Sequence, residues 1–424
     1  MQELDDTITA IATPTGVGGI AIIRISGIAA LSIAKQLCPT LKKWDPRYVS
    51  NTSFRHPETK TLIDEGCIVF FQSPLSFTGE DVVECHCHGS PVVQKQLLSA
   101  ILTAGGRLAT AGEFTKRAFL NGKMDLTKAE SIADLIHAET DISKTVALSH
   151  LQGKLYNHIN HIRSQLMDTL EHIEASIDFP DEVDPLEVGI LTKTLTSRQQ
   201  QVQSILDLKD YGKWIHTGVK CLIVGTPNVG KSSILNQLIG ENRAIVTNIA
   251  GTTRDFIESR VEIGGILFEF TDTAGLRDTL DLVEKEGVSR VQSLMEKAHV
   301  ILWVIDGTRA LSKDEEKLYT KLKKHPHCYG LQNKSDLMSE NQVSSLKNVI
   351  APLVSLSISA KTGAGFSDLK QRLVDDFSVA PIQKDADLIC NVRQVQCLEK
   401  ALSSIDAALR GLSDGHVHDV LSID

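Results

Sequence analysis

The spacing of apolar residues changes along the chain and divides it into segments. Residues 1 to about 118 alternate short β-like runs, such as Ile20–Ile25 and Cys67–Phe71, with glycine turns, which is typical of an α+β domain. From about residue 119 the period becomes helical. Apolar residues from Leu151 to Ile177 recur at steps of three and four, until Pro180 ends the stripe.

The second half of the chain repeats this change of pattern. Residues 217 to about 379 alternate strands, turns and helices as a doubly wound sheet does, and a further helical stripe runs from Leu388 to Leu409. Helices with apolar stripes on both sides of the α/β segment can bury those stripes against each other. We therefore predict an α+β domain over 1–118 and an all-α helical-bundle domain formed by 119–216 and 380–424. An α/β domain is inserted between the two helical parts, over 217–379.

Composition narrows the class of protein. With 44 Lys and Arg against 53 Asp and Glu, the net charge of −9 argues against a basic protein that coats nucleic acid. Eight scattered cysteines do not form a disulfide framework, and the acidic start of the chain is unlike a targeting leader. The longest apolar runs are interrupted, for example by Arg24, so no membrane span is predicted. We expect a cytoplasmic protein.

A phosphate-binding loop is predicted at the start of the α/β segment. The β-like run Val219–Val224 leads into Gly225-Thr226-Pro227-Asn228-Val229-Gly230-Lys231-Ser232, and a helical pattern follows from Ser233 to Ile239. This G-x-x-x-x-G-K-S string between a strand and a helix is the pattern of a P-loop. Its backbone N–H groups turn toward phosphates, Lys231 reaches the β- and γ-phosphates, and Ser232 can bind Mg²⁺.

Three later motifs indicate that the nucleotide is GTP. Asp272-Thr273-Ala274-Gly275 ends a β-like run, where a carboxylate suits a Mg²⁺-linked role and the glycine N–H can sense a γ-phosphate. Asn333-Lys334-Ser335-Asp336 offers an aspartate that accepts two hydrogen bonds from guanine. Ser359-Ala360-Lys361 offers a backbone N–H for guanine O6. Four motifs in this order predict an α/β Ras-like P-loop G domain over 217–379.

The activation of the attacking water must differ from that in Ras. The residue after Asp272–Gly275 is Leu276, which has no hydrogen-bonding group, where Ras-like enzymes carry a glutamine. The charged residues nearby remain open candidates, and the region can also be read as a solvated loop. The candidates are Arg254, Arg277, Asp278, Asp281, Glu284 and Glu286.

The G segment resembles translation-factor-related GTPases of the Era/Der/TrmE type, whose switch I motif matches Ile249-Ala250-Gly251-Thr252-Thr253-Arg254-Asp255. By that resemblance Thr253 closes over Mg²⁺. Motifs along nearly the whole chain are similar to the MnmE/TrmE family of tRNA modification GTPases. They are Ala12–Pro14, Arg24–Gly27, Ser76–Asp81, His88-Gly89, Gly112–Asn121, Asp125-Leu126 and Asp178–Glu182.

This resemblance implies a second cation and a catalytic residue. A K⁺ ion beside the phosphates would be held by Asn228, Thr247, Ile249 and Thr252, and would offset charge as an arginine finger does. The same loop, with Asn248, Ala250 and Gly251, would line the nucleotide. The family's water-orienting glutamate falls on Glu284.

The resemblance also implies a second ligand and several partners. The N-terminal domain would form a homodimer and bind 5-formyltetrahydrofolate through Arg24, Glu84 and Lys123. The whole protein would modify the wobble uridine (U34) of tRNA in a heterotetramer with a flavin-dependent MnmG-type partner. The family's C-terminal Cys-x-Gly-Lys motif does not precede Asp424, so we expect a truncated last helix and leave tRNA modification by this chain open.

Four alternatives accompany these predictions. Gly16–Ala21 formally fits a dinucleotide-binding motif, but the β-branched residues that follow favour a glycine turn between two strands. Cys85-His86-Cys87-His88 suggests a metal site, but neighbours in a strand point to opposite faces, which favours a strand with buried sulfur. At the level of function, the alternatives are a ribosome-assembly GTPase and a scaffold that senses folate and GTP without modifying activity.

Overall fold

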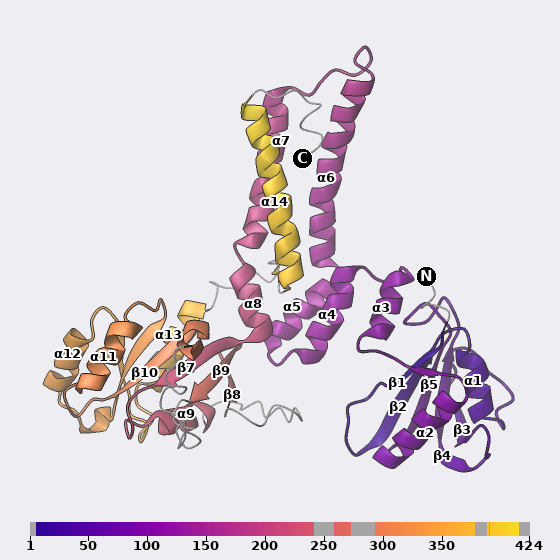
Figure 1. The fold of residues 1–424 in the computed structure, drawn as a ribbon, viewed down its shortest axis with the longest axis horizontal. Helices are drawn as coiled ribbons and strands as arrows, with labels where there is room; N and C mark the ends of the chain where they lie inside the picture. The colour runs from indigo at the N-terminus through magenta and orange to yellow at the C-terminus, as the bar shows by residue number, and fades with distance from the viewer. Residues whose placement is uncertain (1–5, 241–257, 273–292, 378–387, 390, 415–424) are drawn as a thin grey trace. The chain divides into compact units, whose positions relative to one another are not determined.

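The structure is a computed structural model that describes residues 6–240, 258–272, 293–377, 388–389 and 391–414. The chain separates into two compact units, residues 1–132 and 133–424. Figure 1 shows their elements: the first unit is built on one sheet, and the second combines long helices with another sheet. The multidomain class predicted from the sequence is confirmed.

The first unit contains a mostly antiparallel sheet with strand order β3-β4-β5-β2-β1-β6, in which only β1 and β6 pair in parallel. The pairing of β1 with β2 confirms a glycine-containing turn between two strands, because a dinucleotide site needs a helix there. The strands are β1 (Ile8–Ile11), β2 (Gly18–Ser26), β3 (Ser50–Arg55), β4 (Leu62–Phe71), β5 (Val82–Gly89) and β6 (Arg107–Leu108).

Two helices, α1 (Ala30–Leu37) and α2 (Pro91–Thr103), share the core of this sheet, and α3 (Glu113–Leu120) and α4 (Leu126–His137) follow them in the chain. Cys85 and Cys87 are buried in the core, whereas His88 is exposed. The strand interpretation of this segment is therefore confirmed. Among the described residues, no group of His, Cys, Asp and Glu side chains has the arrangement of a metal site.

Long helices form one part of the second unit. They are α5 (Asp141–Leu151), α6 (Lys154–Asp178), α7 (Val188–Leu206), α8 (Lys209–Thr217) and α14 (Val392–Ser413). Side chains of α6, α7 and α14, among them Ile162, Val202 and Ile405, form one core. The prediction that the flanking helical stripes bury each other is therefore confirmed. In the part of the chain that the structure describes, no helix is both long and apolar enough to cross a membrane.

The two helical stripes are shorter than their apolar spacing predicts. Leu151 is the last residue of α5, and Gly153, with a φ of +84°, separates it from α6. A left-handed residue breaks a helix, although Leu151 and Leu155 keep the spacing of a continuous one. Leu388 precedes α14 and does not lie on it.

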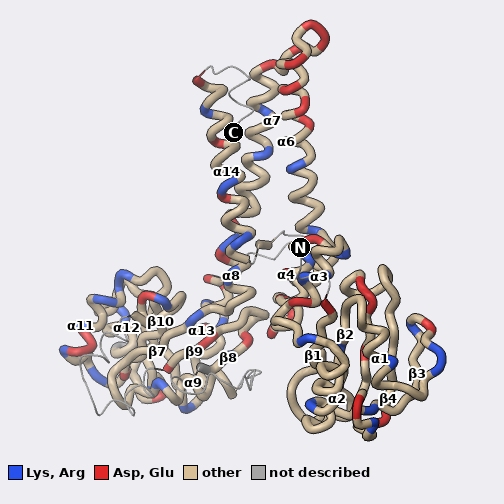
Figure 2. The backbone as a smooth tube through the Cα atoms, turned by 45° about the vertical axis from the view of Figure 1, so that its right-hand side comes forward, with Lys and Arg blue, Asp and Glu red and all other residues tan. Residues whose placement is uncertain are grey.

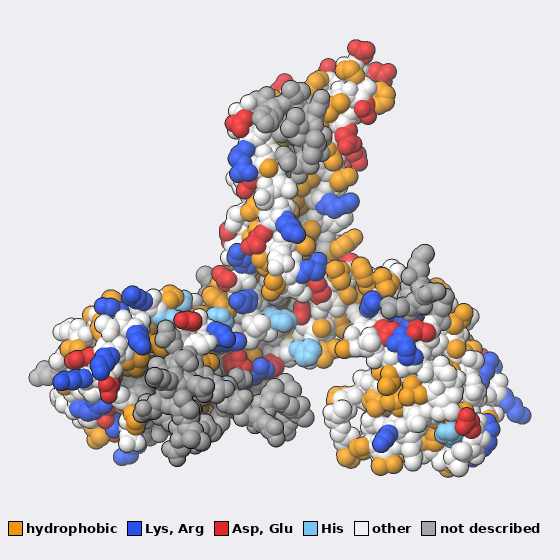
Figure 3. Space-filling view, viewed as in Figure 1, with side chains coloured by type: hydrophobic (Ala, Val, Ile, Leu, Met, Phe, Trp, Pro, Cys, Tyr) orange, Lys and Arg blue, Asp and Glu red, His pale blue; other side chains and the backbone are white. Residues whose placement is uncertain are grey.

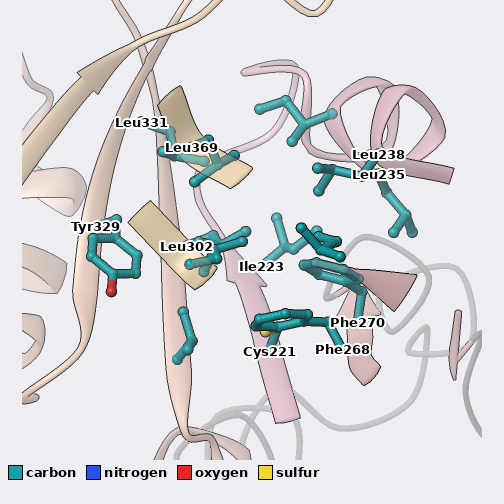
Figure 4. Packing of buried hydrophobic residues seen from close by; sticks show 14 of the residues in the cluster. Cys221, Ile223, Leu235, Leu238, Phe268, Phe270, Leu302, Tyr329, Leu331 and Leu369 are labelled. Atoms are coloured by element: carbon teal, nitrogen blue, oxygen red, sulfur yellow. The ribbon is translucent and has the colours of Figure 1, made fainter. Parts of the chain in front are cut away.

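The other part of the second unit is an α/β sheet with strand order β12-β11-β10-β7-β9-β8, in which only β8 runs antiparallel, to β9. Figure 4 shows the core on one face, where Ile223, Leu302 and Leu331 from the central strands meet Leu235 and Leu369 from helices. The strands are β7 (Val219–Val224), β8 (Glu258–Ile263), β9 (Ile266–Asp272), β10 (Val300–Asp306), β11 (Cys328–Asn333) and β12 (Val354–Ser357).

Helices cover both faces of this sheet, so its central strands are apolar almost throughout. The carboxyl ends of parallel strands meet at one edge, where such sheets bind their ligands. The loops after β7, β10 and β11 lie at this edge. The helices are α9 (Lys231–Gly240), α11 (Lys313–Leu322), α12 (Glu340–Val349) and α13 (Phe366–Phe377), with a short 3-10 turn, η1 (Ser335–Leu337).

Candidate functional site

The loop after β7 has the backbone that a phosphate-binding loop requires. Asn228 and Gly230 both adopt left-handed conformations, with φ values of +65° and +99°. A Cβ on Gly230 would lie 2.2 Å from Asn333 Nδ2, so only glycine fits there. Helix α9 begins directly after it, at Lys231, which directs the N–H groups of the first helical turn toward the loop.

Two side chains of the first turn of α9 contact neighbouring segments: Lys231 contacts the start of the phosphate-binding loop, and Ser232 contacts the end of β9. Lys231 is buried, and its Nζ donates to the carbonyl of Thr226 at 3.1 Å, back across the loop. The hydroxyl of Ser232 donates to Asp272 Oδ2 at 2.8 Å. The structure therefore brings the predicted serine and aspartate together, and their oxygen atoms are of the kind that Mg²⁺ binds.

Asn333, at the end of β11, joins the phosphate-binding loop to the loop after β12. Its side chain is only 3% exposed. Its Nδ2 donates to the carbonyl of Val229 at 2.8 Å, and its Oδ1 accepts from the N–H of Ala360 at 3.1 Å. One amide thus fixes the distance between the segment that faces phosphates and the segment predicted to face the base.

The remaining base-facing residues are held by two further contacts. Asp336 Oδ1 accepts a hydrogen bond from the hydroxyl of Ser359 at 2.7 Å, and the Asp336 side chain is otherwise exposed. Lys334 adopts a left-handed conformation, and its Nζ lies 2.5 Å from Asp306 Oδ2. Lys361 follows on the same exposed loop as Ala360.

Asp306 and Glu315 support the site but were not among the predicted residues. Burial on its own would raise the pKa of Asp306, but hydrogen bonds from Lys334 and Thr308 outweigh it and lower the pKa to about 2. The buried Glu315 accepts from Thr226 Oγ1 at 2.8 Å and pairs with Arg309. One signal for each was present in the sequence: Asp306 follows the apolar run Val300–Ile305, and Glu315 stands three residues after Ser312, the spacing of a capping box.

Part of the predicted site lies outside the described residues. This holds for the catalytic candidate Glu284, for the Mg²⁺ and K⁺ ligands of the switch I segment, and for the residues that follow Asp272. These assignments stay predictions. They concern Thr247, Asn248, Ile249, Ala250, Gly251, Thr252, Thr253, Thr273, Ala274 and Gly275.

In the first unit, Arg24 and Glu84 form one cluster. They are opposite each other on β2 and β5, and Arg24 Nη2 lies 2.7 Å from Glu84 Oε1. The rings of Phe77 and Phe114 both lie near the guanidinium, with centroids 5.4 and 5.5 Å from Cζ. His86 Nε2, 3.6 Å from Glu84 Oε2, is buried without a hydrogen-bond partner among the described atoms. The sequence analysis gave neither aromatic residue as part of a site, and it considered His86 only within the Cys85–His88 metal alternative.

Lys123 contacts the loop that carries Phe77. Its Nζ donates to the carbonyl of Pro74 at 2.9 Å, and a Cβ on Gly79 would lie 3.3 Å from the Lys123 chain. The structure thus places Arg24 and Glu84 in direct contact and Lys123 against the adjoining 74–79 loop. All three predicted residues border one region of the first unit.

The fold and the site define a multidomain protein that carries a Ras-like P-loop α/β domain. Residues 7–123 match the family described as GTP-binding protein TrmE N-terminus, and residues 126–424 match the MnmE helical domain. The chain belongs to the MnmE/TrmE family of tRNA modification GTPases, which confirms the predicted family and the enzyme class that goes with it.

Full-length relatives agree with this assignment. The chain is 39% identical over 428 residues to a protein of Alkaliphilus metalliredigens named tRNA modification GTPase MnmE, covering 99% of this chain and 93% of the relative. A Thermotoga maritima protein of the same name is 39% identical over 421 residues, with the same two coverages.

Solved structures resemble smaller parts of the chain. The G domain of the T. maritima FeoB iron transporter is 21% identical with a TM-score of 0.29, and covers 37% of this chain and 97% of its own. Aquifex aeolicus Era is 24% identical with a TM-score of 0.30, and covers 44% of this chain and 66% of its own.

Proposed function

We propose that this chain hydrolyses GTP to GDP and phosphate with Mg²⁺ and K⁺, and binds 5-formyltetrahydrofolate. With a flavin-dependent MnmG-type partner it uses this cycle to install carboxymethylaminomethyl or aminomethyl groups on the wobble uridine of tRNA. The observation that carries the GTPase part is the bridge that Asn333 makes between Val229 and Ala360. It holds a triphosphate end and a guanine end at a fixed separation.

At the base end of the site, guanine is distinguished from adenine by the hydrogen-bond donors on its ring. The exposed carboxylate of Asp336 accepts from the N1–H and the exocyclic amine of guanine, neither of which adenine presents at those positions. The contact from Ser359 keeps that carboxylate in place. A site preorganised in this way pays less ordering entropy when the base enters.

The oxygen donors Ser232 and Asp272 fit Mg²⁺, which prefers hard oxygen ligands and keeps several waters. Mg²⁺ there would neutralise charge on the β- and γ-phosphates. Lys231, buried beside the loop, supplies a fixed positive charge, and the first turn of α9 supplies N–H donors. These groups bind and orient the phosphates before the reaction and need little reorganisation during it.

K⁺ and Glu284 complete the proposed chemistry. Asn228 is exposed in a left-handed conformation on the phosphate-binding loop, which suits a side-chain amide ligand for a monovalent cation. We expect faster GTP hydrolysis in K⁺ than in Na⁺ at constant ionic strength; equal rates would argue for a conventional arginine finger. We also expect Glu284→Ala to abolish turnover while GTP still binds, and normal hydrolysis by that variant would refute the assignment.

The Arg24 cluster is the proposed folate site. Phe77 and Phe114 offer flat apolar surfaces, Glu84 can pair with the N–H edge of a pterin, and the buried Nε2 of His86 has no hydrogen-bond partner among the described atoms. Lys123 offers a cation for the folate carboxylates. Calorimetric titration with 5-formyltetrahydrofolate tests this site: binding that Glu84→Gln weakens at least about tenfold supports it, and unchanged binding contradicts it.

Charge argues that tRNA affinity comes partly from a partner. Between Arg163 and Lys193 the chain carries eight Asp and Glu and no Lys or Arg. Figure 2 shows these acidic residues along α6 and at the turn to α7, a surface that repels phosphates. tRNA binding that is equal with and without the MnmG-type partner would contradict the partner's role.

Val17, Ile20 and Ile28 are large exposed apolar residues of the first unit, which suits the proposed homodimer.

A further inference from the structure

The β8–β9 hairpin lies in the sequence between the two segments that the proposed function assigns to the nucleotide, switch I and the end of β9. In the sequence, β8 follows the switch I motif at 249–255, and β9 ends at Asp272, which accepts from Ser232. Both strands are joined at the far end by the turn Gly264–Gly265. A displacement imposed on either segment by the nucleotide therefore acts on the same hairpin.

The turn of this hairpin is packed between two helices. A Cβ on Gly265 would lie 2.6 Å from Ile142 Cδ1, in the first turn of α5. A Cβ on Gly264 would lie 2.5 Å from Val374 on α13. A larger residue at either position would have to displace these side chains and adopt a left-handed backbone, with φ of +60° at Gly264 and +84° at Gly265. The turn therefore lies directly against the start of α5.

Arg260 forms the charged part of this contact. On β8, it faces Glu269 of β9, and its Nη2 and Nε lie 3.2 and 3.3 Å from Glu269 Oε1. Its Nη1 lies 2.6 Å from Oε1 of Glu139, in the connection between α4 and α5. The three side chains are 30, 11 and 18% exposed, so water screens the contacts only in part. One guanidinium is thus shared between the sheet and the helices.

A cavity beside this contact gives the guanidinium room to move. It has a volume of about 490 Å³, and Arg260, Glu139, Glu269 and Lys220 are among the residues that line it. The second carboxylate oxygen of Glu139 is buried with no hydrogen-bond partner among the described atoms. Because Arg260 and Glu139 both line this cavity, one side of their contact borders open space and not a hydrophobic core.

A second contact lies in the wall of the same cavity. His216, near the end of α8, lies 2.8 Å from Asp134 on α4. Helix α8 leads directly into β7 and so to the phosphate-binding loop. Figure 3 shows histidine side chains at the surface between the long helices and the sheet. The helices are therefore joined to the sheet at two of its strands, β7 and β8.

We propose that Arg260 is a positioning residue that couples the nucleotide-dependent position of the β8–β9 hairpin to the connection between α4 and α5. This inference rests on the proposed GTPase function. The bond to Glu139 is short, so a hairpin displacement of about 1 Å lengthens it past the usual limit for an N–H···O bond. The guanidinium then keeps only Glu269, and the first turn of α5 is released.

The test is amide hydrogen exchange of the full chain in Mg²⁺ and K⁺, read on a peptide covering residues 138–145, with GDP and with GDP–aluminium fluoride. The wild type should show a difference of about tenfold in exchange between the two states, the size expected for one charge-assisted hydrogen bond. Arg260→Gln and Glu139→Gln should each reduce that difference to within about twofold, while the affinity for a fluorescent GDP analogue stays within about twofold.

Arg372→Gln is the matched control, because it removes an arginine–carboxylate pair within α13, 3.0 Å from Asp376, and leaves the hairpin contact intact. It should keep the wild-type difference. Glu139→Gln also serves if Arg260→Gln does not fold. A wild type with no difference, or variants that retain it, overturns the coupling alone. A wild type that does not bind the GDP analogue overturns the proposed function, and the coupling falls with it.

Discussion

Replacement of Asn333 by alanine removes a side chain that joins the predicted phosphate end of the site to its predicted base end. The substitution breaks two hydrogen bonds, to Val229 and from Ala360. Val229 is fully buried, so its carbonyl loses its partner at a cost of about 1–3 kcal/mol, whereas the half-buried N–H of Ala360 regains water in part. We expect a loss of about 2–3 kcal/mol in the free energy of unfolding.

The same loss should appear in nucleotide affinity, because the two freed segments are those that contact the ligand. A cost of 1.4 kcal/mol is tenfold in affinity, so we expect a weakening on the order of 10- to 100-fold. Titration with a fluorescent GDP analogue and urea unfolding of nucleotide-free protein measure the two effects. Asn348→Ala, at an exposed position on α12, is the control. An Asn333→Ala variant within about twofold of wild-type affinity would refute the bridging role.

Two further predictions concern specificity and acid stability. Asp336→Asn should weaken GTP binding at least about tenfold and improve binding of xanthosine nucleotides, measured by competition, because an amide N–H suits a C2 carbonyl. The hydrogen bond from Arg107 lowers the pKa of Glu113 to about 2, below its ordinary value of 4.5. The stabilisation from Glu113, at most ~3 kcal/mol, should be complete above pH 4.5 and lost as the pH falls toward 2. Glu113→Gln should flatten this part of the unfolding profile, and the exposed Glu58→Gln should not.

The local pattern predicted most elements of the chain. The buried run Val219–Val224 forms β7, and the helical pattern after it forms α9. Such elements depend on residues within a few positions of each other. The spacing of apolar residues predicts the strand and the helix, and the glycines predict the loop between them. The order of the four motifs likewise predicted a site whose described parts, Ser232 with Asp272 and Asp336 with Ser359, lie in contact.

Contacts between distant segments could not be read from the sequence. The pairs Thr226–Glu315 and Glu139–Arg260 join residues 89 and 121 positions apart, and each depends on how strands and helices pack. The prediction of one continuous helix through Gly153 was wrong for a different reason. The apolar spacing continues across this residue, but its left-handed backbone separates α5 from α6. The two aromatic neighbours of Arg24 were missed because neither Phe77 on a loop nor Phe114 on the short helix α3 carries a sequence signal for contact with a distant strand.

The most direct test of the proposed function is competition for the phosphate-binding loop. Nucleotide-free protein is loaded with a fluorescent GDP analogue in Mg²⁺ and K⁺ and then titrated with GTP or ATP, for the wild type and for Lys231→Ala. GTP should displace the analogue from the wild type, ATP should not, and the Lys231→Ala variant should bind the analogue at least about a hundredfold more weakly. Displacement by ATP as readily as by GTP, or wild-type binding by the variant, would contradict the site and the function built on it.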